Sequence, residues 1–165
     1  MNRSKLTIIA FAMALSPTNA SAEALSEYAT IGEWQILVDA SVGNGCLMEK
    51  TFEDGTRMKM GALPNKKGGF LSVENKAWVQ IKEVSTVVMQ FDLDGTLFGG
   101  DVEYIIDGDW RGGYAFFNNP EFVGVLASKN AITITGPANQ PVSYPLNGTS
   151  AALKALKKCQ KENEG

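Results

Sequence analysis

Paired carboxylates are the side chains with which this sequence could most readily do chemistry. The 165 residues include no histidine, which excludes Ser-His-Asp and Cys-His catalysis and histidine-ligated zinc or haem. Two close pairs of acids are present, Asp92 with Asp94 and Asp107 with Asp109. Facing carboxyl groups can hydrolyse a glycosidic bond without a histidine. A carboxylate-based hydrolase is therefore one function to consider, although we assign no catalytic residue and expect no cofactor.

The first pair resembles the opening motif of haloacid-dehalogenase-type phosphatases, D-x-D-G-T after an apolar strand. In such an enzyme Asp92 would be the nucleophile and Asp94 the acid–base group, with magnesium neutralising the phosphate. The same Asp-Gly-Thr string recurs at 54–56, again between alternating runs. Asp-Gly pairs favour hairpin turns because both residues tolerate a positive φ. We therefore interpret both strings as hairpin turns.

The same acids could also bind calcium. Asp92, Asp94 and Glu103 fall at positions 1, 3 and 12 of an EF-hand-like loop. Leu97 stands at position 6, where the sharp turn of that loop needs glycine. No metal site is predicted, and the acids are expected to lie in solvent at hairpin ends.

A disulfide is the expected role of the two cysteines, which are too few for a four-cysteine zinc or iron–sulfur site. Two cysteines in an exported protein most often pair. Cys159 falls on the apolar stripe of a predicted terminal helix, so a bond to Cys46 would fasten that helix to the strands. The alternative is two buried thiols.

A binding patch is predicted at Trp110, Arg111 and Tyr114, in a loop that follows the turn at Asp107-Gly108. Large aromatics and a planar guanidinium are enriched at binding sites, and the intervening glycines let a partner approach the backbone. In the competing interpretation the two aromatics fill the core, and Arg111 pairs with a neighbouring aspartate.

The elements that must position these residues are short strands. Period-2 alternation with Asp-Gly turns predicts a mainly-β fold, a β-sandwich or an open antiparallel barrel. A short helix is expected at 120–128, capped by Asn119 with Pro120 next, and a C-terminal helix at 150–162, capped by Thr149 or Ser150. The alternating runs lie at 34–39, 57–62, 79–82, 86–93, 101–107 and 132–135.

Residues 1–22 are predicted to be a signal peptide. Arg3 and Lys5 precede the apolar run 6–15, and an A-x-A cleavage signature ends at Ala22. The run is too short to span a membrane, and no later segment is predicted to do so. Residues 23–165 form one β-rich domain, for which removal of the two leader cations leaves a net charge of −5. That charge argues against nucleic acid as a partner.

The order of features resembles the invasion-associated locus B group of small secreted and periplasmic alphaproteobacterial proteins. Trp34 begins a strand, Cys46 follows, and a short helix precedes Ile132–Ile134. The strongest likeness is the ending, where 141–148 (PVSYPLNG) leads into an Ala/Leu helix. A second cysteine pair expected in that family is absent here. The resemblance implies a β-rich envelope protein tied to host-cell association and offers no catalytic residues.

The function predicted first is therefore a non-enzymatic secreted or periplasmic envelope protein that binds a protein or an envelope component. The second candidate is a small periplasmic inhibitor of a hydrolase, and the third is the carboxylate-based hydrolase. A partly aromatic sheet face would favour the binding protein, and a protruding rigid loop would favour the inhibitor. A deep cleft with facing acids would favour the enzyme.

Overall fold

One antiparallel sheet dominates the protein. The computed structural model describes residues 25–62, 68–118, 122–136 and 139–163. In these ranges ten strands form a single sheet, accompanied by two α-helices and a 3-10 turn. The predicted mainly-β class with a short helix and a C-terminal helix is confirmed. Of the two predicted architectures the open one is found, and the predicted signal peptide at 1–22 lies outside the described residues.

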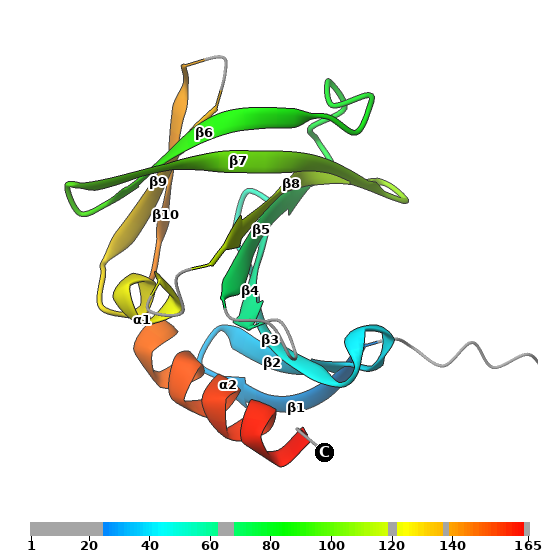
Figure 1. The fold of residues 1–165 in the computed structure, drawn as a ribbon, viewed down its shortest axis with the longest axis vertical. Helices are drawn as coiled ribbons and strands as arrows, with labels where there is room; N and C mark the ends of the chain where they lie inside the picture. The colour runs from blue at the N-terminus through cyan, green and yellow to red at the C-terminus, as the bar shows by residue number, and fades with distance from the viewer. Residues whose placement is uncertain (1–24, 63–67, 119–121, 137–138, 164–165) are drawn as a thin grey trace, which may run out of the picture.

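The strands follow the order β1-β2-β3-β4-β5-β8-β7-β6-β9-β10. In Figure 1, β1 to β3 lie at the bottom, β4, β5 and β8 rise through the middle, β6 and β7 cross the top, and β9 and β10 return on the left. The elements are β1 (Leu25–Ile31), β2 (Trp34–Asp39), η1 (Ala40–Val42), β3 (Gly45–Thr51), β4 (Arg57–Ala62), β5 (Gly69–Asn75), β6 (Thr86–Leu93), β7 (Thr96–Asp107), β8 (Trp110–Phe117), α1 (Phe122–Ala127), β9 (Ala131–Thr135), β10 (Pro141–Pro145) and α2 (Thr149–Asn163).

The two faces of the sheet differ in composition because side chains alternate along each strand. One face, here the helix face, packs against α1 and α2 and holds the apolar core, including the fully buried Trp34, Met48 and Leu71. The other, here the groove face, carries Lys59 and Ser72, which lie opposite each other between β4 and β5. Each fully buried large apolar side chain contributes about 1.5–3 kcal/mol, so the helix face drives folding.

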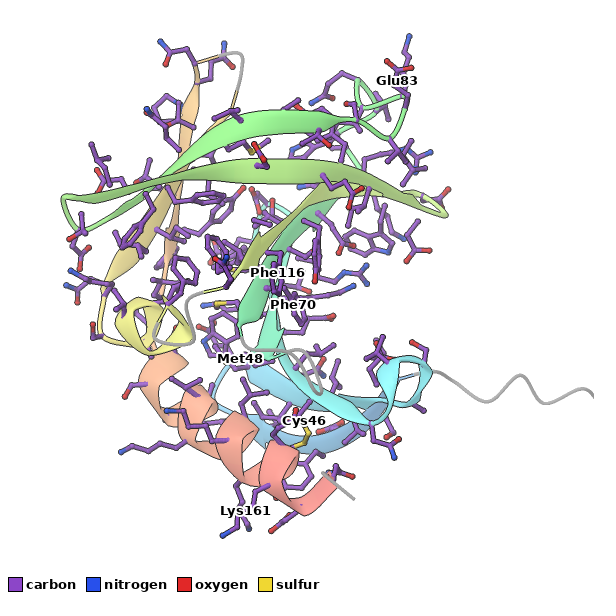
Figure 2. All side chains as sticks on the ribbon, viewed as in Figure 1. Cys46, Met48, Phe70, Glu83, Phe116 and Lys161 are labelled. Atoms are coloured by element: carbon purple, nitrogen blue, oxygen red, sulfur yellow. A yellow bond between two sulfur atoms is a disulfide. The ribbon has the colours of Figure 1, made fainter. Side chains whose placement is uncertain are left out.

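The C-terminal helix α2 is fastened to the sheet by a disulfide. Cys46 and Cys159 are bonded, with Cα atoms 6.1 Å apart, and both are buried. Figure 2 shows the bond beside α2. The predicted pairing is confirmed, and the buried stripe of α2 meets β2 and β3 as its pattern predicts. The Thr149 hydroxyl donates to the Leu146 carbonyl 2.6 Å away, which ties the first turn of α2 to the preceding loop.

Asp94 and Gly95 form the two-residue turn between β6 and β7, with φ of 50° and 86°. Two positive φ values are typical of the type I′ hairpin that the Asp-Gly pair predicts. At the β7–β8 turn the central residues are instead Gly108 and Asp109, because Asp107 still pairs with Trp110. Asp54-Gly55 lies in a longer hairpin loop between β3 and β4.

Two local predictions are wrong. Residues 79–82 form no strand, because the Asn75 side chain accepts the Ala77 N–H at 2.8 Å and turns the chain away from the sheet. Residues 110–114 are no loop but the start of β8, which pairs with β5 on one side and β7 on the other. The start expected for the short helix, at 119–121, lies outside the described residues, and the helix itself is α1.

Candidate functional site

The groove face is hollowed between the two ends of the sheet. A groove of about 580 Å³ lies there, with η1 and the end of β2 on one side and the end of β7 on the other. Figure 1 shows the strands that line it, with β1 to β3 at the bottom, β5 and β8 in the middle and β7 near the top. Its floor comes from β5 and β8 in the centre of the sheet, so the site is built on paired strands and not on loops. The charged and aromatic residues that line the groove are Asp39, Lys59, Phe70, Glu74, Glu103, Tyr104, Asp107 and Tyr114.

A buried carboxylate stands in the floor of the groove. Glu74 is only 2% exposed, and its oxygens meet Arg57 at 2.5 Å, Lys59 at 3.2 Å and the Ser72 hydroxyl at 2.6 Å. Burial alone would raise the pKa of the Glu74 carboxyl, but the hydrogen bonds from Arg57 and Ser72 and the charge of Lys59 hold it below its ordinary value. The carboxylate is therefore ionised and fully engaged at neutral pH.

The predicted patch residues divide between the two faces of the sheet. Trp110 is half-buried on the groove face, and the Arg57 guanidinium stacks 3.9 Å from its ring centre. Lys76 approaches the same ring at 5.0 Å. Arg111 alternates to the opposite face, where its Nη1 donates to the carbonyl oxygens of Gly108 and Trp110. The three side chains therefore do not form one continuous surface.

Tyr114 lies in the groove itself. Its ring stacks on Phe70, with centres 5.4 Å apart, and Phe116 follows on the same face, 44% exposed. Figure 2 shows Phe70 and Phe116 side by side in the middle of the sheet. Burial, together with the nearby Glu103 carboxylate, raises the pKa of the Tyr114 hydroxyl. Tyr114 therefore stays protonated and offers a hydrogen bond above an aromatic floor.

The walls of the groove are acidic. Asp39, Glu74, Glu103 and Asp107 line it, whereas Lys59 is the one basic residue among its described lining residues. Arg57 and Lys59 carry two positive charges against the one negative charge of Glu74, so with Asp39, Glu103 and Asp107 the region has a net formal charge of −2. Glu49, which pairs with Lys59 across the neighbouring strands, has a carboxyl pKa raised by burial. An acidic rim over an aromatic floor suits a cationic ligand with apolar parts.

The two sequence-predicted carboxylate pairs lie at hairpin ends. Asp92 Oδ1 accepts the Gly95 N–H at 2.6 Å, and Asp94 Oδ2 accepts the Asn130 N–H at 2.8 Å. The bonds from Asn130 lower the pKa of the Asp94 carboxyl. Asp109 is exposed at the β7–β8 turn. Within the described ranges no group of three or more metal-ligating side chains gathers, and no helix there is long and apolar enough to cross a membrane.

Sequence reasoning missed the centre of this site. Glu74 and Ser72 lie on β5, where they alternate with Leu71 and Val73, but the polar side chains of this strand are buried as well as the apolar ones. Lys59 falls in the alternating run 57–62, and its place between Met58 and Met60 predicts a polar side chain on the solvent face of a strand. The one available signal was the spacing of Ser72 and Glu74, which places both on the same face of a strand.

The fold and the groove together define a class: a small protein made of one curled antiparallel sheet with a disulfide-fastened C-terminal helix. The chain is similar in structure to invasion-associated protein B from Bartonella henselae, with a TM-score of 0.57 and 16% identity over 81% of this chain and 97% of that chain. This structural match confirms the resemblance predicted from the sequence. No family model matches the sequence. No curated protein matches it either.

Proposed function

We propose that the protein is a non-enzymatic binding protein of the bacterial envelope, periplasmic or secreted, whose groove receives a basic segment of a partner protein. The observation that carries the proposal is the groove itself, which has a net negative lining, with three carboxylates beyond the Glu74 cluster, around a floor of stacked aromatic rings. The buried disulfide supports an oxidising compartment. The likeness to a protein described as invasion-associated supports a role in host association.

The position of the acids favours an extended basic segment. Asp39 and Asp107 stand on opposite arms of the groove, and Glu103 lies between them on β7, one strand from Tyr114. A chain that crosses the groove could place lysine or arginine side chains at these carboxylates and an apolar side chain on Phe70 and Tyr114. Charge complementarity of this kind speeds association and selects the partner.

The protonation states of Glu74 and Tyr114 in the groove floor support a binding role over a catalytic one. Glu74 is held ionised by Arg57 and Lys59, and Tyr114 is held protonated, so neither group has a pKa suited to exchanging protons at neutral pH. Both are locked by packing or hydrogen bonds, which makes the floor a rigid platform.

The test measures the affinity of the mature protein for a short peptide in which lysine alternates with threonine and tyrosine. The double variant Glu103→Gln with Asp107→Asn should bind it at least about tenfold more weakly. The control is Glu33→Gln with Glu53→Gln, which makes the same charge change at exposed positions that do not line the groove. Equal binding of the matching glutamate peptide, or equal losses in both double variants, would overturn the proposal.

A further inference from the structure

A second hollow lies on the helix face, behind the groove. It is a cavity of about 460 Å³, which falls in the range of roughly 300–1,000 Å³ seen for small-molecule sites. The sheet forms it by curling β9 and β10 back past β5 and β8, as Figure 1 shows on the left of the molecule. Its wall includes the buried Leu71, Phe91, Val102 and Ala115 together with the half-buried Ile134.

Small residues keep this space open. Gly113 and Ala115 on β8 face it, and Gly136 follows β9 at its edge. A Cβ added to Gly113 would come within 2.6 Å of a Val102 methyl carbon, so the close packing of β7 on β8 requires a glycine there. The space of the cavity therefore depends on the small residues of β8 and on the residue after β9.

No charged side chain is found among the described residues that line the cavity. Its polar groups are the Gln80 and Gln140 amides, both on exposed residues, and the hydroxyls of Tyr104 and Tyr144. The Tyr144 hydroxyl already lies 3.4 Å from the Thr56 hydroxyl. Because burial of an unpaired charge is very costly, such a space accepts an apolar body and leaves any polar end at the exposed amides.

The segment at the mouth is unusually apolar for a loop. Residues 76–85 bring Trp78 and Ile81 into the wall, and Val79 beside them is 72% exposed. Val142 on the edge strand β10 lines the cavity and is 44% exposed. Residues 79–82, whose alternation wrongly predicts a strand, belong to this segment. Their apolar side chains are explained by their position at the cavity. Contiguous exposed apolar residues beside a cavity mark a ligand entrance.

We propose that this cavity binds one linear acyl chain, with its polar end at Gln80 and Gln140. The long apolar wall takes the hydrocarbon, and the uncharged amides can hydrogen-bond a carboxyl or ester oxygen at the solvent side. The chain could come from a free fatty acid or from a membrane lipid, which share this chemistry. The cavity and the groove open mainly on opposite faces of the sheet, and Tyr104 is the one residue that lines both among the described lining residues.

The test uses the mature protein and cis-parinaric acid, a fatty acid that fluoresces when buried. Fluorescence should rise to saturation at one acid per protein. Val142→Trp places a large ring at the mouth and should weaken binding at least about tenfold. The matched control is Val88→Trp on β6, 68% exposed and on the opposite face from Met89, which lines the cavity. It should bind as the unaltered protein does.

A second measurement does not depend on a variant. A fatty acid that carries a photoreactive diazirine should crosslink to peptides containing 76–85 or β10 and not to the groove residues of β2 and β4. Flotation with phosphatidylcholine vesicles distinguishes a membrane lipid from a free fatty acid as the source of the acyl chain. If the protein floats with the vesicles and Val142→Trp does not, the chain belongs to a lipid. If the protein binds the free acid but does not float, the ligand is a fatty acid. Absence of saturable binding, equal losses in both tryptophan variants, or crosslinking confined to the groove would overturn the proposal.

Discussion

At the scale of single residues, Gly112 on β8 allows a close approach of the backbones of β5 and β8 that any side chain would prevent. Gly112 lies opposite Glu74, and a Cβ on it would stand 2.1 Å from the Val73 carbonyl oxygen and 2.7 Å from the Glu74 Cα. Both atoms belong to the backbone of β5, so a side chain would force apart the two strands that form the floor of the groove.

We predict that Gly112→Ala lowers the free energy of unfolding by at least about 1–3 kcal/mol, through overpacking. Gly100→Ala on β7 is the control, since a Cβ there meets nothing within 4 Å. It should be neutral or slightly stabilising. Urea unfolding of both variants checks this, and equal stabilities would contradict the role assigned to Gly112.

The ion pairs of the buried Glu74 predict that its replacement lowers the stability of the protein. Glu74→Gln leaves Arg57 and Lys59 without their anion and should lower the free energy of unfolding by about 2–4 kcal/mol at neutral pH. Glu33→Gln removes the exposed partner of Lys50, 75% exposed, and should cost less than about 1 kcal/mol.

The cost of Glu74→Gln should depend on pH. The folded pKa of Glu74 lies below its unfolded value of about 4.3, so its contribution is complete above that pH and is lost as the pH falls through the folded pKa. The stability gap between the unaltered protein and the variant should therefore narrow from about pH 7 to about pH 3. A constant gap across chemical unfolding at both pH values would show that the carboxylate is not the cause.

At the scale of elements, α2 depends on a covalent bond as well as on its buried stripe. Cys46 and Cys159 are separated by 113 residues, and α2 also contacts the sheet through the Gln160 side chain, which accepts the Cys46 N–H at 2.9 Å. The Tyr28 hydroxyl on β1 donates to Glu162 at 2.5 Å near the helix end. The bond closes a long loop, so its loss should act mainly on the unfolded state.

The double variant Cys46→Ala with Cys159→Ala should lose up to about 5 kcal/mol of stability. Amide hydrogen exchange should increase in α2 before it increases in the β6–β7 hairpin, which is far from the bond. Reducing agent should reproduce the loss in the unaltered protein and have no effect on the variant. An unfolding midpoint that is insensitive to reductant would contradict a stabilising disulfide.

At the scale of the whole molecule, one sheet carries a charged groove on one face and an apolar cavity on the other. The two sites should respond oppositely to salt, since screening weakens the attraction of exposed charges while salt does not weaken apolar burial. Between about 50 mM and about 500 mM sodium chloride, the lysine peptide should lose several-fold in affinity. Binding of parinaric acid should stay constant or tighten, and parallel weakening of both ligands would show that the sites are not separate.

The sequence by itself determined the parts of the fold that depend on neighbouring residues. Alternation in 34–39 and 86–93 places strands because side chains point to opposite faces in turn. The Asp94-Gly95 turn follows from the ease of positive φ. The stripe of α2 placed Cys159 on its buried side, which made the pairing with Cys46 predictable from two cysteines and a predicted signal peptide.

Only the tertiary structure decided what depends on partners distant in sequence. β5 pairs with β4 on one side, which brings Arg57 and Lys59 to Glu74. On its other side β5 pairs with β8 and not with β6, and Gly112 of β8 lies opposite Glu74. Residues 79–82 alternate as a strand does but pair with no strand, because the turn held by Asn75 directs them away from the sheet. Gly112 and Gly113, in contrast, lie in β8, which pairs with β5 on one side and with β7 on the other. Hydrogen bonding between strands is not local, so the same short pattern becomes a strand, a loop or a binding surface according to what the folded sheet places beside it.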